Sequence, residues 1–312
     1  MTLEFGNDKM PPVRAILAFA IVLGHFSYCG VSALTPIRNL APPAVAMFFF
    51  ISGYGLTWSF NKKGAGYLHG FFRKRMLRIL LPAALVACIH FLLCGGNGTG
   101  LMEHVHRLAT KGNTLLPHFW FVWAILFDYL LFWIGHKFLP PRWARLLILA
   151  GIVAFMFGTA SAGFDRCWWV CSLAFPAGIY FSQHAARVFM FCEKNPLYYW
   201  GLLVSFGLAI VVCFLTGNLA LRPLCFLFSS LLGALLVASL PIDRLRLPVL
   251  RFLGTISYEI YLTHITVMYC LRGNTIHIES QVLYILAVLA VTGAAAWGIH
   301  CLCGFITSKL FS

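Results

Sequence analysis

Long apolar stretches separated by short polar connections run along the whole chain of 312 residues. A bilayer core of about 30 Å takes roughly 20 apolar residues to cross as a helix, so each stretch is a candidate membrane span. The pattern predicts ten spans, at approximately 13–31, 43–60, 78–94, 116–136, 145–160, 166–182, 197–215, 221–239, 252–272 and 281–308. We therefore expect an all-α polytopic bundle, a single integral-membrane domain over residues 1–312 with no appended soluble domain.

Composition supports this class of protein. The chain is 61% hydrophobic and only 10% charged, whereas a soluble domain carries about a quarter charged residues. No small-residue cleavage site leads from the first apolar stretch into a soluble domain, so we interpret it as a retained helix rather than a signal peptide. The bilayer is then an obligatory partner, and the net charge of +14 is a topology signal rather than a nucleic-acid footprint.

The distribution of Lys and Arg predicts the orientation. With the N-terminus in the cytoplasm, 17 of the 23 basic residues fall on the cytoplasmic side, Arg244 and Arg246 among them. The other side keeps only Arg38, Arg107, Lys111, Arg166, Arg222 and Arg272. Basic residues are enriched in cytoplasmic loops, so both termini are expected in the cytoplasm.

The first apolar segment, PPVRAILAFAIVLGHF, carries Arg14 near its start and His25 near its end, well within the predicted span. Eleven residues at 100° each come within about 20° of three full turns, so both side chains lie on one face. They are about 16 Å apart along the axis. Ionisable groups within a membrane are costly and tend to be functional, so we favour a working histidine over one that merely bonds a neighbouring helix.

The stretch FFRKRMLRILLP contains Arg75 and Arg78, three residues apart and hence on one helix face. Two interpretations stay open. The cluster anchors the chain beside anionic lipid, or it clamps phosphate groups, to which the guanidinium fork is matched. Coenzyme A, with a pyrophosphate and a 3′-phosphate, suits a clamp of this kind.

Two further spans carry unusual residues. MFFFISGYGL places Ser52, Gly53, Tyr54 and Gly55 within a helix, where the glycines allow close approach of another helix or a ligand. FLGTISYEIYLTH contains Ser257, Tyr261 and His264, whose spacing puts them on one face.

Other polar residues within the spans allow a structural explanation. Glu259 points away from the face of His264 and requires a partner or a water-filled cavity. Asp128 is a second intramembrane acid that pairs with a neighbour in the simplest interpretation. His90 could join His25 and His264 in one layer, but it has no motif around it, and we favour a structural role.

Cysteine and histidine patterns do not predict a metal site. The eleven cysteines form no CxxC pair suited to a metal, and most behave as small buried hydrophobes. Four of them, Cys29, Cys94, Cys167 and Cys270, fall near predicted outer ends, where a disulfide is one alternative. Glu103, His104, His106 and His118 share an outer loop, but its Gly-rich surroundings lack a rigid scaffold, so no metal is expected there.

Taken in order, four motifs resemble the membrane-bound acyltransferase-3 family, whose members O-acylate sugars and cell-surface polymers. They are Arg14-x10-His25, FFFISGYGL, the Arg75-x-x-Arg78 pair in KRMLRILLP, and SYEIYLTH ending at His264. One position departs from the family, because Pro11 stands where many relatives have an aspartate three residues before the first arginine.

The resemblance implies ten helices with the N-terminus inside, in a bacterial inner membrane. It implies acyl transfer, most often of acetyl, from cytoplasmic acyl-CoA as co-substrate to a hydroxyl of a sugar or glycan, with no tightly bound cofactor. His25 is the expected catalytic base and Arg14, Arg75 and Arg78 the expected donor-binding residues. Candidates for acceptor binding or for supporting His25 are Ser52, Tyr54, Ser257, Glu259, Tyr261 and His264.

Two other functions remain as alternatives. The intramembrane His, Glu and Asp residues could relay protons in a transporter or flippase of a glycan or lipid-linked intermediate. A sensor or scaffold without turnover is the third possibility. Neither the acceptor nor the oligomeric state can be read from the sequence.

Overall fold

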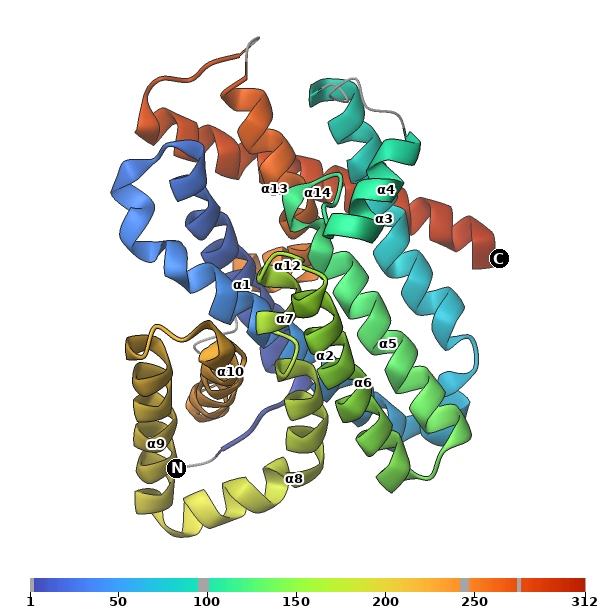
Figure 1. Ribbon diagram of the computed structural model, residues 1–312, viewed down its shortest axis with the longest axis vertical. Coiled ribbons are helices and arrows are strands. Elements are labelled where there is room, and N and C mark those ends of the chain that lie inside the picture. Colours follow the sequence, from blue (N-terminus) through green and yellow to red (C-terminus); the bar gives the residue numbers. More distant parts are fainter. Residues whose placement is uncertain (1–2, 95–100, 242–246, 274–275, 312) are drawn as a thin grey trace.

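The computed structural model describes residues 3–94, 101–241, 247–273 and 276–311, and these form a bundle of helices (Figure 1). The described part of the chain has no strand, only an isolated bridge between Arg272 and His277. The all-α polytopic class is therefore confirmed. The α-helices are α1 (Met10–Phe26), α2 (Ala41–Lys63), α3 (Phe71–Cys94), α4 (Leu101–Lys111), α5 (Trp120–Phe138), α6 (Pro141–Ser161), α7 (Cys167–Val170), α8 (Ala174–Lys194), α9 (Pro196–Leu215), α10 (Arg222–Ser239), α12 (Pro248–Thr255), α13 (Ser257–Leu271) and α14 (Gln281–Phe311).

Eight helices in the described ranges are long and apolar enough to cross a membrane, and they match eight of the ten predicted spans. The pattern predicts a continuous helix for each of the two remaining spans, 166–182 and 252–272. The structure instead divides each of them into two helices. The first is divided into α7 and α8, and the second into α12 and α13, with a break at Ile256. Periodicity detects apolar content but not a local backbone break, which explains the difference.

The predicted outer loop that carries Glu103, His104 and His106 also differs from the prediction, because residues 101–111 form α4. Its Glu103 and Arg107 are one turn apart and form an ion pair of 2.8 Å, a spacing that stabilises an exposed helix. Arg244 and Arg246, which entered the count of cytoplasmic charges, lie outside the described residues.

Close packing of α2 against α8 depends on two glycines. A Cβ on Gly53 would lie 2.2 Å from the carbonyl oxygen of Phe175, and one on Gly178 would lie 2.0 Å from that of Phe50. No side chain fits at such distances, so the two backbones approach through the missing side chains. The expectation of a close approach is confirmed for Gly53. A Cβ on Gly55 would meet nothing within 4 Å, so that glycine serves no contact of this kind.

A third glycine, Gly254, allows α12 to pack closely against α1. A Cβ on Gly254, near the end of α12, would lie 1.8 Å from the carbonyl oxygen of Pro11 in the first turn of α1. Pro11, the position that departs from the family pattern, is thus a packing residue at this crossing. The hydroxyl of Ser257 then donates to the carbonyl of Gly254 at 3.0 Å, satisfying one acceptor at the helix break.

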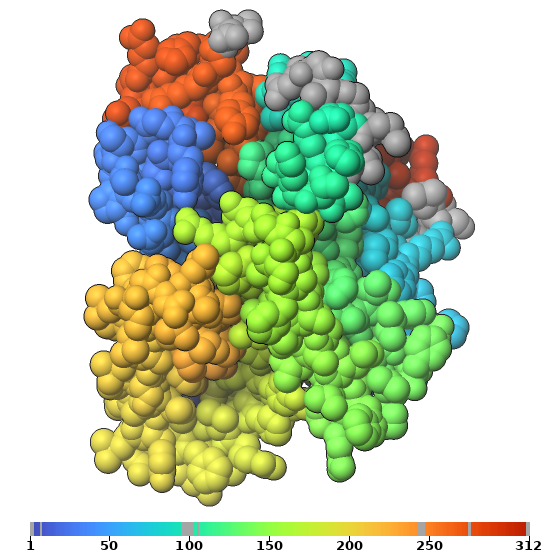
Figure 2. Space-filling view, viewed as in Figure 1, coloured from blue at the N-terminus to red at the C-terminus, as the bar shows by residue number. Residues whose placement is uncertain are grey.

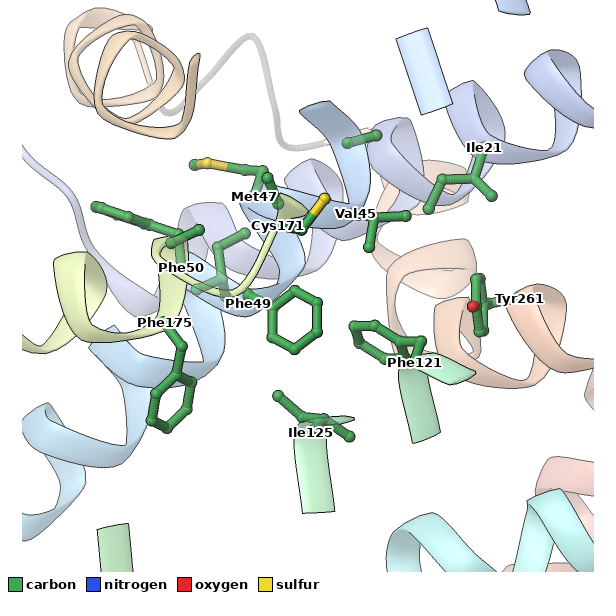
Figure 3. Close-up of a cluster of buried hydrophobic side chains, with 14 of the residues drawn as sticks. Ile21, Val45, Met47, Phe49, Phe50, Phe121, Ile125, Cys171, Phe175 and Tyr261 are labelled. Atoms are coloured by element: carbon green, nitrogen blue, oxygen red, sulfur yellow. The ribbon is translucent and has the colours of Figure 1, made fainter. Parts of the chain in front are cut away.

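The apolar core lies where α1, α2, α5, α8 and α13 meet, and Figure 3 shows its centre. Phe49 and Phe121 are in edge contact at 4.9 Å between ring centroids, and Phe121 contacts Tyr261 at 5.2 Å. Tyr261 is the polar end of this aromatic series (Figure 3). It links the core to the histidines described below.

The N-terminal segment before α1 packs against the end of α10. The buried Lys9 ammonium donates to the carbonyls of Glu4 at 2.7 Å, Ala238 at 3.0 Å and Val237 at 3.3 Å. The last two belong to the C-terminal turn of α10, where a positive charge is favourable. Burial disfavours the charged ammonium and lowers the pKa of Lys9.

Candidate functional site

Two histidines from distant parts of the sequence meet between α1 and α13. His264 Nε2 lies 3.3 Å from His25 Nδ1, although 239 residues separate them. His264 is fully buried, whereas His25 is half-buried. The structure thus brings together two of the predicted site residues, and His25 keeps partial access to a substrate.

Backbone carbonyls determine which ring nitrogens carry protons. His264 Nδ1 lies 2.7 Å from the Tyr261 carbonyl, and His25 Nδ1 lies 2.9 Å from the Ile21 carbonyl. A carbonyl only accepts, so both Nδ1 atoms are donors. In the neutral rings both Nε2 atoms are then unprotonated. The single Nδ1 proton of His25 is then shared between the Ile21 carbonyl and His264 Nε2, and His25 Nε2 carries a lone pair.

A third histidine, which the sequence analysis had assigned to an outer loop, belongs to the same cluster. His118 is buried in the 3-10 helix η5 (Pro117–Phe119), and its ring centroid lies 5.1 Å from that of His264. Its Nε2 donates to the Leu262 carbonyl at 3.1 Å, while its Nδ1 has no hydrogen-bond partner among the described residues. The Tyr261 hydroxyl donates to the His118 carbonyl at 2.5 Å.

Glu259 finds a partner on the last helix. His300 Nδ1 lies 2.9 Å from Glu259 Oε1, joining α13 to α14. The adjacent Tyr258 hydroxyl donates to the Ile79 carbonyl of α3 at 2.9 Å. The polar residues of the SYEIYLTH segment therefore fix α13 against α1, α3, η5 and α14 on several sides.

The second group of predicted site residues converges near the other end of α1. Arg14 is close enough to Arg75 and Arg78 for their positive charges to interact. Arg75 Nη2 donates to the Tyr67 hydroxyl at 2.7 Å, in the 3-10 helix η4 (Gly64–Leu68). Three guanidinium groups from two helices thus form a basic cluster.

A cavity of about 220 Å³ opens beside this cluster. Its walls come from the end of α2, from η4 and from the start of α3, and the lining residues are Lys63, Gly66, Tyr67, His69, Phe71, Lys74, Arg75 and Arg78. Four of these are basic and none is acidic, which suits an anionic ligand.

The basic cluster and the histidine cluster share one rigid element. Arg14 and His25 both lie on α1, which runs unbroken from Met10 to Phe26. The rise of 1.5 Å per residue then separates them by about 16 Å along the axis, as the sequence predicted. The partners of these two residues come from other helices. Arg75 and Arg78 lie on α3, and His264 lies on α13.

Two predicted site residues, Ser52 and Tyr54, lie on α2 and belong to neither cluster. The Tyr54 hydroxyl is occupied by the Phe5 carbonyl at 2.6 Å, and its ring contacts that of Phe5 at 4.7 Å. Ser52 is half-buried on the same helix. A role for either in substrate binding stays a prediction.

The remaining intramembrane groups do not form a metal centre. In the described part of the chain no group of three or more His, Cys, Asp or Glu residues is arranged to hold a metal ion. His90 Nδ1 lies 3.1 Å from the Thr266 hydroxyl, in keeping with a structural role. Asp128 is buried, and its Oδ2 has no hydrogen-bond partner among the described residues, so the expected pairing is not found for that atom.

Sequence reasoning missed three contributors, His118, His300 and Tyr67. Each lies on a different helix from the residue that it contacts. His118 bonds to Leu262, His300 to Glu259, and Tyr67 to Arg75. His118 was visible only as a polar residue directly before a strongly apolar span, and His300 as a histidine within one.

A family model described as an acyltransferase domain matches residues 13–301, and this range contains both the histidine and the basic clusters. The searches for similar curated proteins and similar solved structures found no match.

Proposed function

Because the chain belongs to the acyltransferase-3 family and is an integral membrane protein, we propose that it is an O-acyltransferase using cytoplasmic acyl-CoA. The acyl group is acetyl in this proposal, and the acceptor is a hydroxyl of a sugar or cell-surface glycan. The membrane is a bacterial inner membrane. The contact between His264 Nε2 and His25 Nδ1, which leaves His25 Nε2 as a free base, is the observation that carries the proposal.

In this mechanism His25 Nε2 takes the proton of the acceptor hydroxyl as its oxygen attacks the thioester carbonyl. The tetrahedral intermediate collapses, the C–S bond breaks, and the proton passes to the departing CoA sulfur. The products are the O-acyl ester and free CoA. General-base catalysis by a placed side chain contributes typically about 10²–10⁴-fold in rate.

The basic cluster is the proposed donor site. Guanidinium groups hold phosphate oxygens through paired N–H donors, and the cavity offers Arg75 and Arg78 together with Lys63 and Lys74. Arg14 would add a contact from the α1 side. The distance of about 16 Å along α1 is one that the extended pantetheine arm can span, so the thioester reaches His25 while the phosphates stay at the arginines.

The predicted residues of α13 support His25 rather than react. His264 holds the tautomer of His25, and Tyr261, through the His118 carbonyl, holds α13 against η5. Glu259 and Ser257 fix the start of α13 through His300 and Gly254. The acceptor is then expected at the open side of His25.

The test uses the purified chain in lipid vesicles with acetyl-CoA labelled in the acetyl group. Release of free CoA or transfer of label to a panel of glycans is the expected result. His25→Ala should lower this rate by about 10²–10⁴-fold without loss of the folded protein on size-exclusion chromatography. Donor binding with no turnover across the panel would contradict the proposal, and glycan uptake into vesicles without CoA would favour a transporter.

A further inference from the structure

Two cysteines face each other at the ends of α3 and α13. Cys94 Sγ lies 3.8 Å from Cys270 Sγ, across 176 residues of sequence. Cys94 is exposed and Cys270 is partly exposed, so small reagents can reach the pair. Both thiols are free in the structure.

The two helices lie in register at this point. One turn before the cysteines, His90 Nδ1 of α3 lies 3.1 Å from the Thr266 hydroxyl of α13. Position 90 precedes 94 by four residues, as 266 precedes 270, so the two contacts repeat along one seam between parallel helices. Near the start of α13, Tyr258 bonds to Ile79 of α3. The approach of the sulfurs is thus supported by packing along the helices rather than by the position of one side chain.

A disulfide requires the sulfurs to approach from 3.8 Å to about 2.05 Å. Figure 1 places both helix ends at the same end of the bundle. The charge distribution predicts that this end faces away from the cytoplasm, where oxidising conditions allow disulfides to form and persist.

We propose that Cys94 and Cys270 form a disulfide that cross-links the outer ends of α3 and α13. The step is thiol–disulfide exchange with a small-molecule or protein disulfide. One thiolate attacks the donor disulfide, the second attacks the mixed disulfide, and the donor leaves as two thiols. The Cys94–Cys270 S–S bond forms, the donor S–S bond breaks, and two protons and two electrons pass to the donor.

The proposed disulfide would connect the two helices that carry the predicted site residues. Helix α3 holds Arg75 and Arg78, and α13 holds His264. An apolar groove between them and α14 is lined by Val86 and Ile89 of α3 and by Thr266 and Cys270 of α13, among others. The cross-link would fix the outer width of this groove and tie the arginine-bearing helix to the histidine-bearing one.

The test exposes the folded full-length chain to oxidised glutathione, blocks the remaining thiols by alkylation, and maps the peptides by mass spectrometry. We expect a peptide pair joined through Cys94 and Cys270, with two hydrogens lost and no glutathione added. Of the eleven cysteines, these two alone should then escape alkylation together, and reductant should restore both.

Matched variants separate this pair from general thiol oxidation. Cys88→Ser removes another exposed cysteine of α3 and should leave the cross-link intact, whereas Cys94→Ser and Cys270→Ser should each abolish it. The oxidised wild type should unfold at a higher temperature than its reduced form, and Cys94→Ser should show no such difference.

The proposal is overturned if the treated wild type carries separate glutathione adducts on Cys94 and Cys270. It is equally overturned if Cys94 joins a second copy of the chain. The wild-type peptide map requires no variant to fold and no acyl transfer to be measured, so its outcome is independent of the proposed function.

Discussion

At the scale of single residues, the site is determined by hydrogen bonds to atoms that cannot donate. The Ile21 and Tyr261 carbonyls each fix one histidine tautomer, and in this tautomer His25 Nε2 carries a lone pair. His264 is therefore a positioning residue in the proposed reaction rather than one that meets the substrate. Its contribution should be smaller than that of His25, because the Ile21 carbonyl still holds His25 when His264 is removed.

We accordingly expect His264→Ala to lower kcat by about 10–100-fold, the range found when a metal-ligating histidine loses the hydrogen-bond partner that orients it. The KM for acetyl-CoA should remain close to that of the wild type. His264→Gln, whose amide oxygen can accept from His25 Nδ1, should recover much of the loss. Steady-state kinetics of the three proteins checks this, and equal defects in both variants would contradict a role through the hydrogen bond.

The basic cluster makes a separate prediction about affinity. Arg75→Ala removes a guanidinium that both lines the cavity and bonds to Tyr67. A lost charge-assisted hydrogen bond costs about 1.5–3 kcal/mol, so the KM or Kd for acyl-CoA should rise about 10–100-fold with kcat less affected. Arg142→Ala, an exposed arginine on α6, is the control and should leave both unchanged. A fall in kcat alone for Arg75→Ala would argue against donor binding.

At the scale of elements, close helix crossings determine where the polar residues meet. Gly53 and Gly178 allow α2 and α8 to touch, and Gly254 seats α12 against the first turn of α1. The break at Ile256 lets α12 and α13 take different directions. Irregular backbone at membrane depth is tolerated where protein surrounds it, and here the break directly precedes the segment that carries Glu259, Tyr261 and His264.

The two glycines of the SGYG sequence provide a matched stability test. Gly53→Ala would place its Cβ 2.2 Å from the Phe175 carbonyl oxygen, and overpacking of this kind costs about 1–3 kcal/mol. Gly55→Ala meets open space and gains up to about 1 kcal/mol from helix propensity. Thermal unfolding in detergent should therefore shift downward for the first variant and remain unchanged or rise for the second. Equal shifts would contradict the crossing described above.

At the scale of the whole molecule, the charge asymmetry and the long last helix determine how the bundle sits in the bilayer. Helix α14 has 31 residues, a length of about 46 Å at 1.5 Å per residue, which exceeds the bilayer core. Its two ends should therefore emerge on opposite sides. In the space-filling view the blue N-terminal part of the chain adjoins the orange part near residue 270 (Figure 2), and Arg272 donates to the Cys29 carbonyl in the α1–α2 connection. The α1–α2 connection and the segment after α13 are therefore expected on one face of the membrane.

Labelling by a membrane-impermeant maleimide tests this orientation. In a background with the exposed and partly exposed cysteines replaced by serine (Cys29, Cys88, Cys94, Cys167, Cys270 and Cys301), Ser280→Cys should label only from the outer side. Ser308→Cys should label only from the cytoplasmic side, because the basic residues gather on that side. The opposite pattern would reverse the predicted topology, and labelling of both positions from one side would mean that α14 does not span.

The sequence by itself determined the features that depend on local geometry. Hydrophobic run length located eight of the ten spans as continuous helices, and the helical rise gave the spacing of Arg14 and His25 along one axis. It also selected residues whose roles no contact yet tests, Ser52 and Tyr54 among them.

Only the tertiary structure decided which groups meet. His25 and His264 are 239 residues apart, His118 joins them from η5, and Glu259 is paired by His300 of α14. No periodicity encodes such contacts, because they depend on which helix faces pack together. Close contacts between backbones, such as that of Gly254 with Pro11, determine which helix faces can pack together. A single-residue break such as Ile256 likewise leaves no trace in a hydrophobic pattern, since it changes the backbone direction without changing the apolar content.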